Sequence, residues 1–252
     1  MNITTKRSIN ELSIRIDKAY SDMKINKSPN TFTIIDRELD NEISYKYAIE
    51  TNTWIDDLYS LGNWFIGGNE NTNAVNERKQ MMYKSNNLMN TLSLKNFLKK
   101  ITLHNSIFSD TCYEFVGFTG LKNNGVGRHY VEPIYKQHFI RDAELASSIE
   151  ISNYMKLIGF KQTDEFKFVN EMIEVSDVRP RNVLKDKNGE IYIIDAEFKI
   201  LNETIKAEPN YLNLFHKESS ERKIKAIQEM KKTPMNYEQE LMRHKKMHEK
   251  LQ

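Results

Sequence analysis

Residues 176–197 read SDVRPRNVLKDKNGEIYIIDAE, and this segment constrains the structure more than any other part of the chain. A polar turn, Asp186-Lys187-Asn188-Gly189, separates two apolar runs, which is typical of a β-hairpin. Because a hairpin brings its ends together, we expect Asn182 and Asp195 to lie close to each other. An amide oxygen and a carboxylate are hard ligands that suit Mg²⁺, which completes its octahedron with water and phosphate.

The spacing of three polar residues in this segment is specific. Asp177 lies five positions before Asn182, and Asp195 lies thirteen positions after Asn182. The pattern resembles the catalytic loop of protein kinases and of aminoglycoside- and choline-kinase-like enzymes, D-x-x-x-x-N followed by a strand that ends in a metal-binding Asp. The resemblance implies that Asp177 is catalytic and accepts or orients the proton of a substrate hydroxyl, while Asn182 and Asp195 bind Mg²⁺.

A second resemblance extends upstream, to the kinase-like domain of polyvalent proteins from bacterial mobile elements. That family has a helix containing Trp, a Gly-Gly-x-Glu turn and a strand that ends in lysine. The matching pieces here are Trp54, Gly67-Gly68-Asn69-Glu70 and Tyr83-Lys84. The resemblance implies that Lys84 contacts the phosphates of ATP and that the backbone amides of Gly67 and Gly68 lie close to them. A surface lysine and an ordinary hairpin turn are the alternative that the sequence leaves open.

Residues 132–140, EPIYKQHFI, are expected to form a strand and a loop. By the same resemblance they form the hinge between two lobes, where the adenine of the nucleotide would hydrogen-bond to the backbone around Gln137 and Phe139. A core strand followed by an ordinary loop accounts for the same residues.

The order of the expected elements favours an α+β protein of two lobes. Hydrophobic periodicity predicts helices at about 8–25, 41–61, 93–101 and 142–158, and strands at about 63–66, 80–84, 113–118, 130–135, 166–173 and 191–194. This order suggests a helical extension (1–44), a small antiparallel β-rich N-lobe with one helix (45–136), a reduced and mainly helical C-lobe that carries the catalytic and metal-binding loops (137–216), and a charged helical tail (217–252). We therefore expect a two-lobed protein-kinase-like fold.

The sequence also departs from the protein-kinase pattern. Protein kinases pair their strand lysine with a glutamate from the following helix, yet no Glu occurs between Glu77 and Glu114. Either Glu114 pairs with Lys84, or Lys84 has no acidic partner. The sequence after Asp195 is short for the full substrate-binding lobe of a protein kinase. We therefore expect a small acceptor surface, or one that a partner completes.

Composition excludes several classes of protein. The formal net charge is only +2, which makes no global electrostatic case for nucleic-acid binding. The one cysteine, Cys112, lies in an apolar run and fits a reducing cytoplasm, where such a thiol is a small buried hydrophobe. The six histidines have no metal-ligand spacing, which argues against a zinc site. Neither a signal peptide nor a membrane span is apparent, so we expect a cytoplasmic protein with no membrane contact.

Three functions remain open. The first is a kinase-like phosphotransferase that uses ATP and Mg²⁺ and acts on a hydroxyl of a protein or a small molecule. The second is a catalytically silent kinase-like binding module of a phage or mobile element. The third is a nucleic-acid-associated protein that uses residues 217–252, which carry ten Lys and Arg against six Glu. The same segment would also suit an acidic protein partner.

Overall fold

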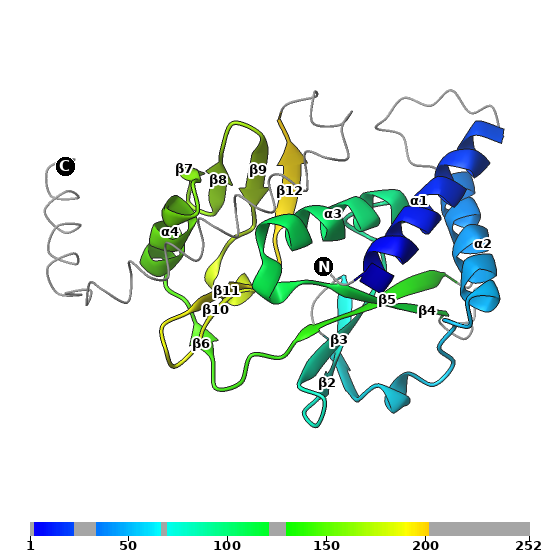
Figure 1. The fold of residues 1–252 in the computed structure, drawn as a ribbon, viewed down its shortest axis with the longest axis horizontal. Helices are drawn as coiled ribbons and strands as arrows, with labels where there is room; N and C mark the ends of the chain where they lie inside the picture. The colour runs from blue at the N-terminus through cyan, green and yellow to red at the C-terminus, as the bar shows by residue number, and fades with distance from the viewer. Residues whose placement is uncertain (1–2, 23–33, 67–69, 121–129, 202–252) are drawn as a thin grey trace, which may run out of the picture.

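A computed structural model of the protein describes residues 3–22, 34–66, 70–120 and 130–201 (Figure 1). The predicted mixed α+β class is confirmed. The helices are α1 (Ile3–Asp22), α2 (Ile34–Glu50), α3 (Leu94–Ile107) and α4 (Ser148–Leu157), with 3-10 turns at Leu58–Ser60, Ser109–Thr111 and Pro180–Asn182. The strands are β1 (Asn63–Ile66), β2 (Asn71–Asn76), β3 (Met81–Asn86), β4 (Glu114–Gly120), β5 (Val131–His138), β6 (Glu144–Leu145), β7 (Lys161–Asp164), β8 (Lys167–Val169), β9 (Ile173–Ser176), β10 (Val183–Lys185), β11 (Ile191–Ile193) and β12 (Glu197–Ile200).

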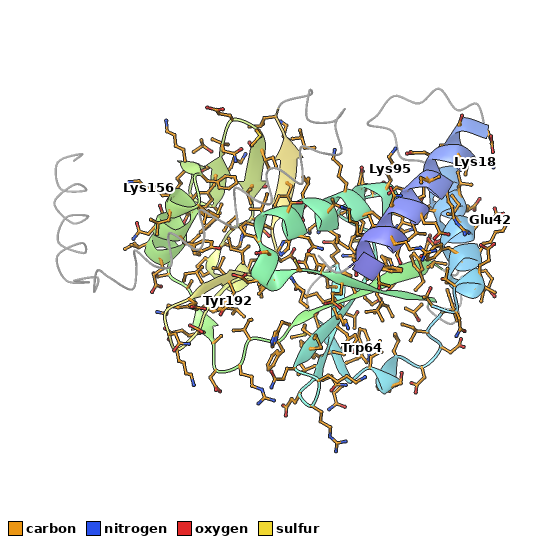
Figure 2. The ribbon with its side chains drawn as sticks, viewed as in Figure 1. Lys18, Glu42, Trp64, Lys95, Lys156 and Tyr192 are labelled. Carbon is orange, nitrogen blue, oxygen red and sulfur yellow. The ribbon has the colours of Figure 1, made fainter. Side chains whose placement is uncertain are left out.

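An antiparallel sheet of five strands, in the order β1-β2-β3-β5-β4, organises the first half of the chain. Strand β3 is central, and its Lys84 lies opposite Asn73 of β2 and Tyr135 of β5. Helices α1, α2 and α3 lie along one side of the sheet (Figure 1). Trp64 packs on a separate apolar cluster, and Figure 2 shows it on the side of the sheet away from Lys95 of α3. The sheet therefore has apolar packing on both faces.

Helix α3 connects the two largest hydrophobic clusters. It begins where the sequence predicts, because the Ser93 hydroxyl accepts a hydrogen bond from the Asn96 N–H at 3.2 Å. Its first turns bury the predicted stripe, which packs against α1, α2 and the five-stranded sheet: Leu94, Phe97, Leu98 and Ile101. Its last turns pack against α4 and the later strands, through Leu103 and Ile107. The helix thus joins the sheet to the second half of the chain.

The second half contains more strand than the sequence indicates. Over residues 137–201 the structure has the single helix α4, a three-stranded sheet in the order β11-β10-β6 and a four-stranded sheet in the order β12-β9-β8-β7. The prediction of a mainly helical C-lobe is therefore wrong for these residues. The physical reason is an alternation of buried β-branched side chains with period two, as at Ile173 and Val175, which suits a strand.

Two predicted helices have different bounds. The helix predicted over 41–61 is α2, which ends at Glu50. The chain turns at Asn52, whose φ of 53° is left-handed, and forms only a short 3-10 turn at Leu58–Ser60. Helix α4 begins at the capping box of Ser147 and Glu150 rather than at Asp142.

Some predictions lie outside the described residues. These are the turn at Gly67 and Gly68, most of the glycine-rich turn before residue 130, and the tail over 217–252. Among the helices that the structure describes, none has the length and apolar character needed to cross a membrane.

Candidate functional site

The predicted hairpin around residues 183–193 is confirmed. Strands β10 and β11 pair antiparallel from Val183 opposite Ile193 to Lys185 opposite Ile191. Asp186 closes the turn, because its Oδ1 accepts hydrogen bonds from the backbone N–H groups of Asn188 and Glu190, both at 2.9 Å. Gly189 takes a φ of 79° there, a conformation that favours glycine.

The hairpin brings Asn182 beside the segment that carries Asp195. The Ile194 N–H donates to the Asn182 carbonyl oxygen at 2.9 Å, so Asn182 lies across from the residue that precedes Asp195. The Asn182 amide nitrogen, Nδ2, donates to Asp177 twice, at 2.8 Å to the carboxylate Oδ2 and at 2.9 Å to the backbone carbonyl. These bonds join Asn182 to Asp177 and to the neighbour of Asp195.

Asp177 is held in an uncommon conformation and is paired with arginine. Its φ is 58°, in the left-handed region that Asp tolerates better than most residues. Its carboxylate forms an ion pair with Arg179, and Arg181 Nη2 lies 3.7 Å from Oδ2. Its side chain remains 29 % exposed, so a hydroxyl group in solution can reach the carboxylate.

Lys84 reaches the same region from the five-stranded sheet. Its side chain is buried, and its Nζ donates to the Ile194 carbonyl at 3.3 Å, directly before Asp195. Burial lowers the pKa of Lys84 to about 8, although the charge of Asp195 acts in the opposite direction. Lys84 is therefore not the surface lysine of the simpler interpretation.

Lys84 makes no ion pair with Glu114 or with any other carboxylate among the described residues. Glu114 instead forms an ion pair with Lys136 at 3.2 Å. A second lysine, Lys100 of α3, lies in the same region. Its Nζ lies 2.6 Å from Glu197 Oε1 and 3.2 Å from Asp195 Oδ1. The site thus contains two lysines and two carboxylates, and Lys100 is paired with both carboxylates.

Charge pairing sets the ionisation of this cluster. Burial would raise the pKa of Asp195, but the positive charges of Lys100 and Lys84 outweigh it and hold the pKa below its usual value. Burial would likewise lower the pKa of Lys100, and the two carboxylates outweigh it and raise that pKa. Burial raises the pKa of Glu197, against the opposing effect of Lys100. Asp195 is therefore an anion near neutral pH.

His104 lies one turn after Lys100 on α3 and is fully buried. Its Nε2 lies 3.1 Å from both the carbonyl and the hydroxyl oxygen of Thr111. Burial lowers the pKa of His104 to about 3, so the ring is neutral near neutral pH. We therefore assign it a packing role next to the charged cluster.

The two predicted hinge residues are engaged within the protein. The Gln137 side chain is buried, and its Nε2 donates to the Thr111 carbonyl at 2.7 Å. The Phe139 N–H donates to the Gln80 carbonyl at 2.9 Å. An adenine contact at the Phe139 N–H would therefore have to replace this bond. A nucleotide contact at either residue stays a prediction.

The groups at Asn182 and Asp195 fit a magnesium ion carried by phosphates. Since Asn182 Nδ2 is directed at Asp177, its Oδ1 is left as an acceptor, and no donor to it occurs among the described residues. Asp195 supplies a partly exposed carboxylate. Within the described part of the chain, no cluster of three or more His, Cys, Asp and Glu side chains could hold a metal. Such a sparse set of oxygen ligands is typical of Mg²⁺, which keeps water and phosphate as its other ligands.

The sequence interpretation assigned no role in the site to Lys100 or Glu197. A signal for Lys100 was present, because Lys100 and His104 lie on the face of α3 that Phe97 and Ile101 bury. Charged residues are rarely buried without a partner, so a lysine on an apolar helix face indicates a buried acid nearby. Which acid it meets depends on tertiary contacts that helix periodicity does not reveal.

Comparison with known proteins gives one family match. A family model for a serine/threonine/tyrosine kinase found in polyvalent proteins matches residues 37–202. The matched region includes Lys84 and extends past Asp195 and Glu197. No curated protein and no solved structure gives a significant match.

Proposed function

Because the chain belongs to the family of serine/threonine/tyrosine kinases found in polyvalent proteins, we propose that residues 37–202 bind ATP with Mg²⁺ and transfer a phosphoryl group to a hydroxyl. The acceptor is a hydroxyl of a protein or a small molecule, and the reaction takes place in the cytoplasm. In this proposal β1–β5 with α3 act as the N-lobe, and the strands from β6 onward with α4 act as a reduced C-lobe. Gly67 and Gly68 would bring their backbone amides to the phosphates.

One observation carries the proposal: Lys84 of the central strand and Asp195 of the distant hairpin meet at one place. Lys84 Nζ bonds to the carbonyl of Ile194, the neighbour of Asp195. Kinases use a lysine on strand β3 and a metal-binding Asp for the same phosphate groups. The convergence of these two residue types, one from the five-stranded sheet and one from the segment between β11 and β12, supports a phosphate and metal site.

Each residue has a role that suits its chemistry. The carboxylate of Asp195 and the Oδ1 of Asn182 would hold Mg²⁺, which neutralises charge on the phosphates when it is bound. The ammonium of Lys84 would bind a phosphate oxygen. Asp177 would orient the acceptor hydroxyl and accept its proton, as the acceptor oxygen bonds to the γ-phosphorus and ADP departs.

The test is a calorimetric titration of the full chain with Mg²⁺ and a non-hydrolysable ATP analogue. Wild type should bind, and Asp195→Ala should lose Mg²⁺-dependent binding, because the metal would keep too few anionic ligands. Asp164→Ala is the matched control, since Asp164 is exposed at the turn between β7 and β8. Unchanged affinity and metal dependence in Asp195→Ala would show that the site assignment is wrong.

A second function is a kinase-like module that binds without catalysis. The observation in its favour is that Lys84 makes no ion pair with a described carboxylate, while Lys100 occupies one side of Asp195. Nucleotide hydrolysis or transfer to added acceptors, measured with radiolabelled ATP, separates the two functions. Mg²⁺-dependent binding with no turnover on any hydroxyl acceptor would favour the silent module.

A further inference from the structure

Lys100 bridges two carboxylates that differ in their surroundings. Its side chain is only 10 % exposed, whereas the side chains of Asp195 and Glu197 are 28 % and 43 % exposed. Lys100 comes from α3, Glu197 is the first residue of β12, and Asp195 lies two positions before it. The ammonium is therefore enclosed between the proposed metal ligand and a more exposed acid.

The contact with Asp195 conflicts with metal binding at the same carboxylate. A divalent cation on Asp195 would lie near an ammonium that is 3.2 Å from Oδ1, and two such cations repel each other strongly in a partly buried site. The contact with Glu197 is shorter, at 2.6 Å, and does not involve Asp195. Glu197 therefore offers Lys100 a partner that it keeps when a metal takes Asp195.

The other charges around Lys100 are consistent with Lys100 staying on Glu197 while a metal binds Asp195. Lys84 is a second cation near Asp195, so the carboxylate keeps a positive neighbour even without Lys100. Glu70 is buried and acts on Lys100 as a further negative charge, and its Oε1 has no hydrogen-bond partner. Glu197 and Glu70 thus supply negative charge to Lys100 that does not come from Asp195.

We propose that Lys100 is an internal counter-cation of Asp195 and that Glu197 is a positioning residue that holds Lys100 off the metal ligand. Without metal, Lys100 neutralises both carboxylates and keeps α3 against β12. When the metal–nucleotide binds, Lys100 stays on Glu197 and Asp195 is released to the metal. This inference rests on the proposed function, because it requires Asp195 to bind the metal.

The test measures the affinity of the full chain for Mn²⁺·ADP, with free Mn²⁺ followed by electron paramagnetic resonance. Lys100→Met should bind at least about fivefold more tightly, because the competing cation is removed. Glu197→Gln should bind at least about fivefold more weakly, because Lys100 then rests on Asp195 alone. A structural role shared by the pair would move both affinities in the same direction. Weaker binding by Lys100→Met would overturn the proposal.

A double-mutant cycle separates an action of Glu197 through Lys100 from the direct effect of its negative charge on the metal. In a Lys100→Met background, Glu197→Gln should change the affinity less than about twofold, because Glu197 acts through Lys100. Equal effects of Glu197→Gln in both backgrounds would overturn the proposal. Lys99→Met removes the same charge from the exposed face of α3 and should leave the affinity unchanged.

The outcomes also separate this inference from the proposed function. If the wild type does not bind Mn²⁺·ADP, or if Asp195→Ala binds it equally well, both are wrong. If binding depends on Asp195 but Glu197→Gln does not weaken it, only the proposed roles of Lys100 and Glu197 are wrong. Circular dichroism melting establishes that each variant is folded. Should Lys100→Met unfold, equal or tighter binding by Glu197→Gln would still overturn the proposal.

Discussion

Lys84 and Ile194 are hydrogen-bonded across 110 positions of sequence, with the Lys84 Nζ donating to the Ile194 carbonyl at 3.3 Å. The same carbonyl accepts the hydroxyl of Tyr113 at 2.8 Å, and the ammonium lies 5.3 Å from the centroid of the Tyr113 ring. These contacts fix the central strand against the segment that leads to Asp195. They also enclose the ammonium, which is why its pKa falls to about 8.

This low pKa predicts how nucleotide binding depends on pH. Above pH 8 the free protein loses the proton of Lys84, whereas bound phosphates favour the charged form. Binding then takes up a proton, so affinity should fall as pH rises above about 8, by at most about tenfold per pH unit. Calorimetry from pH 7 to about 9.5, in buffers of different ionisation enthalpy, measures both the affinity and the proton uptake.

The lowered pKa of Lys84 also makes the free energy of unfolding depend on pH. Between about pH 8 and 10.5 the unfolded chain still holds the proton that folded Lys84 has released, so the contribution of Lys84 to the free energy of unfolding rises with pH.

The control for the pH dependence of nucleotide affinity is Lys84→Arg, since arginine stays charged throughout this range. A wild-type affinity that is constant across pH 8, or one that changes equally in Lys84→Arg, would contradict the role of Lys84.

Asp177→Asn should separate binding from catalysis. Its carboxylate is proposed to act on the acceptor hydroxyl and not on ATP, so nucleotide affinity should stay nearly unchanged. Phosphoryl transfer should fall on the order of a hundredfold or more, because the substituted amide cannot accept the proton. The Asn182 amide keeps the Asp177 backbone carbonyl as an acceptor, which preserves the loop. Equal turnover by wild type and variant, measured under single-turnover conditions, would reject this role.

The sequence predicts the hairpin well because a tight turn depends on local chemistry. The turn from Asp186 to Gly189 needs only its own residues, and it fixes the register that brings Asn182 to Ile194. Ser93 and the stripe of α3 are predictable for the same reason. The family resemblance then supplies roles that local chemistry alone does not.

The missed elements depend on long-range pairing. Strand β2, Asn71–Asn76, is largely polar, and it becomes a strand because β1 and β3 pair with it on both sides. Strand β12 forms by pairing with β9, which the sequence places twenty or so residues away. The partners of Lys100 are unpredictable in the same way, since Glu197 approaches α3 only after these sheets form.

Truncation after about Phe215 should leave a folded core and remove a contact surface. The expectation rests on sequence alone: the tail from Lys217 is rich in charge, Pro234 divides its two helical patterns, and its apolar stripe is narrow. Circular dichroism melting of the truncated protein measures the effect. A midpoint lower by more than about ten degrees would mean that the tail completes the core, because several kcal/mol of packing would be missing.

Asn105→Ala should destabilise the protein more than any exposed substitution on the same helix. Asn105 is buried on α3, and its side chain donates to the Tyr113 carbonyl at 2.8 Å and accepts from the Tyr113 N–H at 2.6 Å. Alanine would leave both backbone groups buried and unpaired, at a cost of about 2–4 kcal/mol.

Urea denaturation measures this loss, and the slope of the free energy of unfolding against urea should not change. The matched control is Asn96→Ala, whose amide donates to the Thr91 carbonyl at 3.0 Å in an exposed position. It should cost less than about 1 kcal/mol, because water replaces the lost bond. If Asn105→Ala costs no more than Asn96→Ala, then Asn105 does not hold α3 against the start of β4. The placement of Lys100 and Tyr113 at the site would then need another explanation.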